Sequence, residues 1–194
     1  MRFVFILIVL AVMALPRPAR ADDDYRDCFK ASTDPKQTED GIAVCTRLIK
    51  SNHWHDVDLA RLLSNRAALY IKLAKLDLAM ADLDRAGALA PDYVFAHDNR
   101  GEVWRLRGSN DKAMAEYDKA VKLDPNFLSA YYDRGQTYEA MKDLDKARSE
   151  YQTALDKPGA GRPIDTWAKD QARKALDRLA ADSKSVKGDN KDAK

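Results

Sequence analysis

The stretch YVFAHDNRGEVWRLRGSNDKAMAEYDKAVKLDPN, residues 93–126, decides the fold because it has counterparts on both sides. Matching residues occur 34 positions earlier, within 59–92, and 34 positions later, from 127 onward. The columns that keep their character through three units are Ala67, Gly101 and Gly135; Tyr70, Trp104 and Tyr138; Ala79, Ala113 and Ala147; Leu83, Tyr117 and Tyr151; and Ala86, Ala120 and Ala154. Pro91 and Pro125 close the first two units, and Pro158 comes one residue early in the third. This shared register indicates an internal repeat.

Each unit is expected to contain two helices, which in the second unit span 94–107 and 111–123. Gly108 can adopt the left-handed conformation that ends the first helix. Ala74 and Lys142 take its place in the other two units, so the first helices there are expected to end less sharply.

The repeated columns predict how the helices pack. Small residues allow two helix backbones to approach closely, while the large residues of other columns fill the space between hairpins. A single helix pair cannot bury such a face, whereas three stacked pairs form a continuous core. The expected fold is therefore all-α, a superhelical stack of antiparallel helix hairpins.

The column pattern resembles the tetratricopeptide repeat over Leu59 to Pro158, and residues 22–51 look like a divergent preceding unit. The tryptophan that typically opens the motif is replaced by Leu63, His97 and Tyr131. The resemblance implies a solenoid of interaction modules, in which the first helix of each unit lines a concave groove.

Residues 1–21 are predicted to be a cleaved secretory signal. Met1-Arg2 is the positive end, Phe3 to Leu15 is the apolar core, and Ala19-Arg20-Ala21 is a small-x-small cleavage site. An uncleaved membrane anchor is the alternative, but spanning a bilayer takes about 20 apolar residues. We expect cleavage after Ala21, a periplasmic or secreted protein of bacterial type, and no stable membrane anchor after cleavage.

Charge gives no indication of a nucleic-acid partner. The chain has 33 basic and 31 acidic side chains, a formal net charge of +2. Loss of Arg2, Arg17 and Arg20 with the signal changes the balance to 30 against 31, or −1. A nearly neutral chain offers no electrostatic reason to bind DNA, RNA or anionic lipid.

Cys28 and Cys45 are the only cysteines. They fall on two expected helices, 22–32 and 35–51, whose antiparallel packing would bring them together, and an exported chain meets an oxidising environment. We expect a disulfide, with two buried reduced thiols as the alternative. Residues 51–58 are interpreted as a polar joint, where His53 and His55 lack further ligands for a metal.

The C-terminal region is expected to cap the stack. Residues 159–163 form a turn in this prediction, and a helix from Ile164 to Ala181 covers the last unit through one apolar stripe. A helix that binds a partner is the alternative. Residues 182–194 are expected to be a disordered tail.

We predict no catalytic residues, no metal and no cofactor, because the sequence has no nucleophile elbow, phosphate-binding glycine loop or zinc-protease motif. By the family register, the residues that point into the groove are Arg61, Ser64, Ala68, Ile71 and Lys72; Phe95, Asp98, Asn99, Glu102 and Arg105; and Ser129, Tyr132, Asp133, Gln136 and Glu139. Relatives that bind chaperone C-terminal carboxylates use a clamp of lysines, asparagines and arginine, of which only Asn99 fits here.

The sequence thus predicts a protein-binding scaffold or adaptor of the cell envelope, with a protein or peptide partner held in the groove. Two alternatives stay open: an accessory subunit of an envelope hydrolase, and a structural oligomer that assembles end to end. The predicted groove residues would otherwise be an ordinary solvated face. The sequence decides neither the partner nor the oligomeric state.

Overall fold

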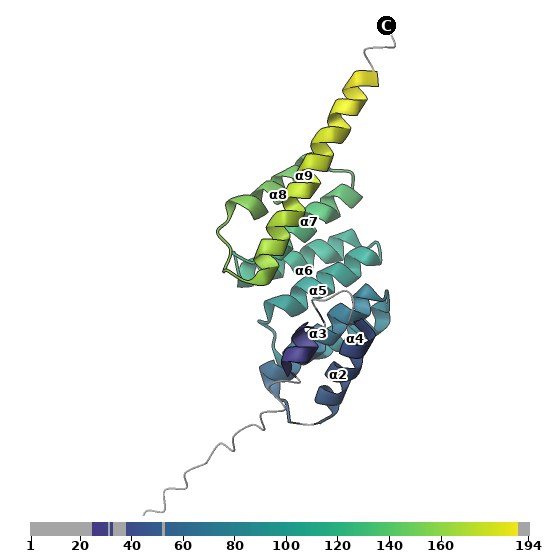
Figure 1. Cartoon of the computed structure of the whole chain (residues 1–194), viewed down its shortest axis with the longest axis vertical. Coiled ribbons are helices and arrows are strands. Elements are labelled where there is room, and N and C mark those ends of the chain that lie inside the picture. The colour runs from purple at the N-terminus through teal and green to yellow at the C-terminus, as the bar shows by residue number, and fades with distance from the viewer. Residues whose placement is uncertain (1–24, 31, 33–37, 52, 190–194) are drawn as a thin grey trace, which may run out of the picture.

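The computed structural model describes residues 25–30, 32, 38–51 and 53–189, and these form helices and short connections with no strand among them (Figure 1). A short helical segment at residues 25–30 precedes α2. The helices are α2 (Thr38–Lys50), α3 (Asp56–Lys72), α4 (Leu76–Leu89), α5 (Val94–Leu106), α6 (Asn110–Leu123), α7 (Leu128–Ala140), α8 (Leu144–Asp156) and α9 (Pro163–Asp189). The predicted signal peptide and its cleavage site lie outside the described residues.

The helices pack as hairpins that stack in chain order. α3 packs on α4, α5 on α6 and α7 on α8, while α3, α5, α7 and α9 contact one another in sequence (Figure 1). We call α3, α5 and α7 the first-helix layer. The predicted all-α stack of hairpins is confirmed.

Two glycines in this layer are required by the close approach of a tyrosine. A Cβ at Gly101 would lie 2.5 Å from the ring of Tyr117, and Gly135 meets Tyr151 in the same way. The first unit has the smaller Leu83 in the tyrosine column and accepts the methyl group of Ala67, with both residues fully buried. The two columns therefore complement each other in volume.

The turns between the two helices of each unit are alike, so the expected difference in sharpness is wrong. Gly108, Ala74 and Lys142 have φ values of 74°, 54° and 66°. Each donates its N–H to a carbonyl three residues earlier at 2.9 Å. Packing of the hairpins holds Ala74 and Lys142 in a conformation that a glycine would adopt without strain.

Two of the residues that replace the opening tryptophan, His97 and Tyr131, hydrogen-bond the preceding closing proline. His97 Nε2 lies 2.8 Å from the carbonyl oxygen of Pro91, and the Tyr131 hydroxyl donates to that of Pro125 at 3.1 Å. These bonds tie the start of α5 and α7 to the preceding connection.

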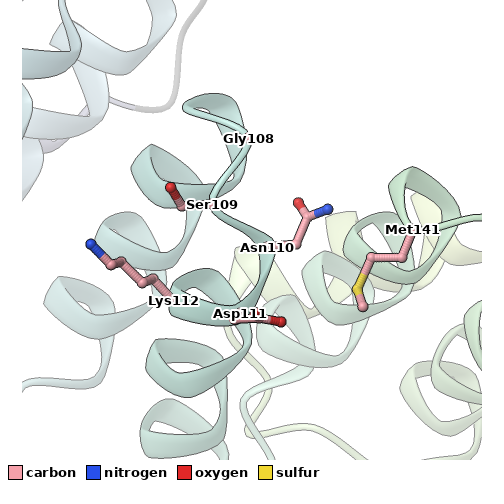
Figure 2. Close-up of a pocket in the computed structure, with 6 residues that line it drawn as sticks. All are labelled: Gly108, Ser109, Asn110, Asp111, Lys112 and Met141. Carbon is pink, nitrogen blue, oxygen red and sulfur yellow. The ribbon is translucent and has the colours of Figure 1, made fainter.

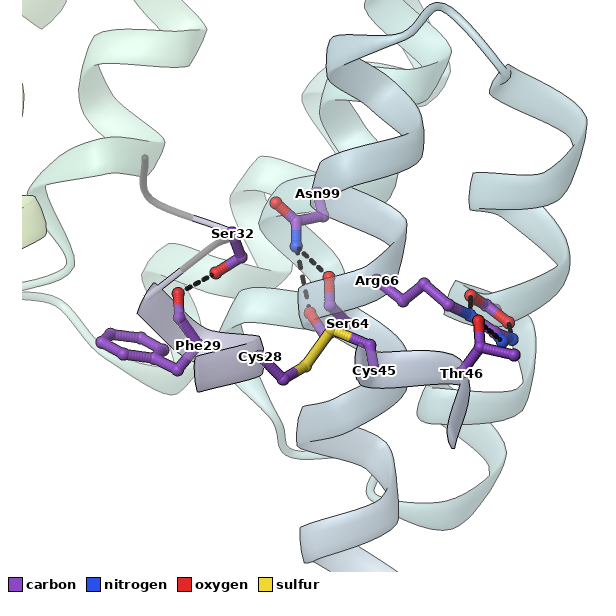
Figure 3. Close-up of a disulfide and its surroundings, with 9 residues drawn as sticks. Cys28, Phe29, Ser32, Cys45, Thr46, Ser64, Arg66 and Asn99 are labelled. Carbon is purple, nitrogen blue, oxygen red and sulfur yellow. Dashed lines mark hydrogen bonds and ion pairs between the residues drawn. A yellow bond between two sulfur atoms is a disulfide. The ribbon is translucent and has the colours of Figure 1, made fainter. Parts of the chain in front are cut away.

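The cysteines of the N-terminal hairpin meet in a geometry that is compatible with a disulfide (Figure 3). The Cys28 and Cys45 sulfurs are 2.15 Å apart, the Cα atoms are 5.0 Å apart, and both residues are fully buried. They pack with Trp54, whose ring centroid lies 5.4 Å from that of Tyr25. The connection expected as a polar joint is therefore partly core, and α3 begins within it at Asp56.

α9 packs on α7 and α8, with Ala168, Ala172 and Leu179 buried against the last unit. It continues to Asp189, past residue 182, from which the sequence predicts a disordered tail. No glycine or proline interrupts residues 182–187, so nothing ends the helix before Gly188. Residues 190–194 lie outside the described part of the chain.

Candidate functional site

The predicted groove residues lie on the first-helix layer, but not all of them are available to a partner. Ser64, Asp98, Tyr132 and Asp133 are at most 9% exposed. These four side chains are directed at neighbouring helices, and the contacts between successive first helices explain why.

We use joint for the contact between two successive helices of the first-helix layer. The α3–α5 joint, where Ser64 meets Asn99, is neutral. Asn99 Nδ2 donates to Ser64 Oγ at 3.0 Å and lies 3.3 Å from the Ser64 carbonyl oxygen (Figure 3). Asn99 is the one residue that fits the carboxylate clamp, and here its amide is engaged with α3. A chaperone-type clamp is therefore not supported by this geometry.

The α5–α7 joint contains two carboxyl groups around one hydroxyl. Ser129 Oγ lies 3.1 Å from Asp98 Oδ2 and 3.2 Å from Asp133 Oδ2. A hydroxyl has only one hydrogen to donate, so both contacts are satisfied when one carboxyl is protonated and donates to Ser129. Burial and Glu102 raise the pKa of Asp133 to about 7. Burial and the neighbouring Asp133 raise the pKa of Asp98 well above its usual range.

Glu102 and Arg105 lie on the solvent-exposed side of this joint. Their side chains are 38% and 21% exposed, and the nearest charged atoms are 3.9 Å apart, which is an ion pair without a hydrogen bond. Burial raises the pKa of Glu102 against the opposing effect of Arg105 and Lys72.

Tyr117 reaches the same joint from α6. The residue is fully buried, and its hydroxyl lies beside the Arg105 side chain. Burial raises the pKa of Tyr117, and the charges of Asp133 and Asp98 raise it further. The repeat columns predict only packing for Tyr117 and give no signal of its polar end.

In the third unit the predicted groove residues are covered by α9. The Trp167 ring stands edge-on to Tyr132 with centroids 5.3 Å apart, and Arg178 binds both carboxylate oxygens of Glu139 at 2.8 Å. Gln136 Nε2 donates to the Tyr132 hydroxyl at 2.8 Å. This part of the layer is occupied within the chain itself.

At the other end, Arg61 pairs with Asp58 at 3.3 Å, and Lys72 Nζ donates to the Ser32 carbonyl oxygen at 2.7 Å. The ring of Phe95 lies edge-on to Phe127, 5.0 Å between centroids. Between α5 and α7 the structure brings together Asp98, Glu102, Arg105, Ser129 and Asp133 from the predicted set.

A repeated ion pair within the hairpins is not among the features predicted from the sequence. Arg66, Arg100 and Arg134 each bind a carboxylate 16 residues later, at 2.7, 2.9 and 2.8 Å. Glu116, the partner of Arg100, is also bonded to His97. Burial raises the pKa of Glu116, but bonds from His97, Arg100 and Lys119 lower it to about 2. An arginine column followed at a fixed distance by an acidic column was the available signal.

Other surfaces offer less chemistry. The pocket at the α5–α6 turn is lined by Gly108, Ser109, Asn110, Asp111, Lys112 and Met141, and these side chains do not converge on one point (Figure 2). In the described part of the chain, no three His, Cys, Asp or Glu side chains are arranged to hold a metal. None of its helices has the length and hydropathy to span a bilayer.

The stacked hairpins and their 34-residue register define a helical-repeat solenoid. A family model described as TPR repeat matches residues 101–142 of the chain. No curated protein matches it.

Solved structures of tetratricopeptide-repeat proteins have the same fold. One is the MamA protein, 24% identical over 71% of this chain and 75% of its own, with a TM-score of 0.53. YrrB, described as a TPR protein with an unusual peptide-binding site, is 20% identical over 70% and 67%, with a TM-score of 0.52. The first TPR of Spaghetti (RPAP3), bound to the HSP90 peptide SRMEEVD, is 23% identical over 65% and 97%, with a TM-score of 0.52.

Proposed function

We propose that this chain is an exported scaffold that holds a segment of a partner protein along the first-helix layer, without catalysing a reaction. The observation that carries the proposal is the partly exposed set of Phe95, Glu102, Arg105 and Gln136 on α5 and α7. α9 covers Tyr132 and Glu139 beside it and leaves this part of the layer for a partner.

Two solved relatives support a segment as the ligand, because one is bound to a peptide and another is described with a peptide-binding site. A C-terminal carboxylate is a poor candidate for this chain. Asn99 is engaged with Ser64, and Asp133 would repel an anion.

Export is supported by the signal-like pattern of residues 1–21 and by the paired Cys28 and Cys45. We expect the chain isolated from the cell envelope to be two hydrogens lighter than its reduced form by intact-mass measurement. Two thiols that react with an alkylating reagent without prior reduction would show the disulfide proposal to be wrong.

In-cell photocrosslinking tests the binding proposal. A photoreactive residue at Phe95 or Gln136 should capture an envelope protein, whereas one at Asp118, which is exposed on the second helix α6, should not. Capture only at Asp118, or at none of the three positions, would overturn the proposal.

A further inference from the structure

We propose that the α5–α7 joint is a proton-controlled hinge between the second and third units. The hinge is closed while Asp98 and Asp133 hold a proton between them, and it opens when both are ionised. The inference goes beyond the proposed function, because it concerns the shape of the stack and not the partner.

The geometry of the joint requires a proton. Ser129 Oγ lies 3.1 Å from Asp98 Oδ2 and 3.2 Å from Asp133 Oδ2, and its single hydrogen can serve only one of them. The two carboxyl groups also hydrogen-bond each other, which two carboxylates cannot do. Since Asp98 belongs to α5 and Asp133 to α7, the shared proton holds two units together.

The charged groups on the groove side of the pair do not balance its full ionisation. On α5, Glu102 adds a third carboxyl group, and Arg105 pairs with it at 3.9 Å. On α6, the Tyr117 hydroxyl lies beside Arg105. From α3, Lys72 acts on Glu102 and donates to the Ser32 carbonyl oxygen. Full ionisation would therefore place three carboxylates against two cations that already have other partners.

The charged groups on the far side of α7 are engaged elsewhere. Tyr151 of α8 and Arg178 of α9 both bind Glu139. Burial raises the pKa of Tyr132, on α7 itself, to about 12, so this residue stays neutral near pH 7. Loss of the last proton therefore leaves excess negative charge in a buried joint, where like charges repel strongly.

The last proton is lost above neutral pH. Burial and Glu102 raise the pKa of Asp133 to about 7, and burial and Asp133 raise the pKa of Asp98 well above its usual range. Because the two groups interact, they titrate as a pair. The hinge is thus closed in acidic and neutral solution and opens in alkaline solution. Opening separates Glu102 on α5 from Gln136 on α7, two of the contacts proposed for the partner segment.

The neighbouring joints have other residues in the same columns. Ser64 and Asn99 occupy them one unit earlier, where the amide donates to the hydroxyl at 3.0 Å. Tyr132 and Trp167 occupy them one unit later, with ring centroids 5.3 Å apart. Neither contact needs a shared proton, so the α3–α5 joint is an internal control for the hinge.

Distances between nitroxide labels on the second helices test the inference. Ala81, Ala115 and Ser149 lie 34 residues apart on α4, α6 and α8, and all three are exposed. Labels on Ala115→Cys and Ser149→Cys span the hinge, and labels on Ala81→Cys and Ala115→Cys span the α3–α5 joint. Cys28 and Cys45 are buried and paired, so they do not take the label. Double electron–electron resonance measures both distances from pH 6 to pH 9.5.

We expect the distance across the hinge to increase by about 1–2 Å above pH 7, the usual size of helix shifts at such contacts, while the control distance stays constant. Asp98→Asn should keep the hinge closed up to pH 9.5, because its amide donates to Asp133 at any pH. Asp111→Asn, at an exposed position of α6, alters the net charge equally and should leave the pH response intact. Circular dichroism establishes that each variant is folded.

A hinge distance that stays constant in the wild-type background would overturn the inference. An equal increase in both distances would also overturn it, because the whole stack would then loosen. A pH response that persists in folded Asp98→Asn would assign the hinge to other groups. The two label pairs decide the inference even if this variant does not fold. These measurements use the chain alone, so their outcome is separate from success or failure of the photocrosslinking experiment.

Discussion

The two joints of the first-helix layer use the same columns of the repeat for opposite chemistry. Between α3 and α5, Ser64 and Asn99 form a neutral and mutually satisfied pair. Between α5 and α7, Asp98 and Asp133 share one hydroxyl and lie in a buried cluster of carboxyl groups. The repeat thus determines where neighbouring helices touch, and the side chains at the contact determine whether it is only structural.

Moving the acidic pair into the first joint should produce the largest effect. The double substitution Ser64→Asp and Asn99→Asp puts two carboxyl groups where Phe95 takes the place of Ser129, so no hydroxyl lies between them. We expect the free energy of unfolding to fall by about 3–5 kcal/mol at neutral pH, the cost of an uncompensated buried charge. Urea denaturation measures it.

Asn99→Ser is the matched control, since it keeps the joint neutral. If the acidic double variant were as stable as the wild type at neutral pH, the joints would tolerate either chemistry. The difference between the two joints would then have no effect on stability.

The pH dependence of stability should distinguish the joints in the wild-type chain. The pKa of Asp133 is about 7 in the folded state, above its unfolded value, so the folded chain binds the extra proton. The stabilisation that Asp133 contributes to the folded chain is fully present below its unfolded pKa and is lost as the pH rises to about 7. We expect a loss of about 2–4 kcal/mol across this window, from 1.36 kcal/mol per unit of pKa difference.

Denaturation between pH 5 and 8 measures this loss, and Asp133→Asn should flatten the profile. Glu116 does not interfere, because its lowered pKa of about 2 means that its contribution is lost only in more acidic solution. Parallel profiles for the variant and the wild type would show that Asp133 does not hold the proton.

Removing one hydrogen-bonding group from each joint should have a smaller effect. Ser129→Ala should cost about 1–2 kcal/mol at pH 8, above the Asp133 pKa of about 7, and less at pH 5, where Asp133 is protonated. Asn99→Ala should cost about 1 kcal/mol at either pH, because its partner is neutral. The same denaturation series gives both values, and a pH-dependent cost for Asn99→Ala would contradict the comparison.

The sequence predicted the helix pairs because small and large residues recur in register, as at Gly101 and Tyr117. It did not predict the joints. Asp98 and Asp133 fall at positions that the family resemblance assigns to a groove, and their burial depends on how closely α5 approaches α7. Tyr117 combines a core ring with a hydroxyl among carboxyl groups, and a pattern based on residue size detects only the ring.

The turns within the units should give the smallest effects, and they test whether the units are equivalent outside the joints. Gly108→Ala should lower the free energy of unfolding by about 0.5–1 kcal/mol, because φ at this position is positive. Ala74→Gly and Lys142→Gly should each raise it by a similar or smaller amount, since they relieve the same strain. A loss of stability in Gly108→Ala together with a gain in Ala74→Gly and Lys142→Gly would show that the three turns are equivalent and that the units differ only in their joints. A stabilising Gly108→Ala would show that the three turns are not equivalent.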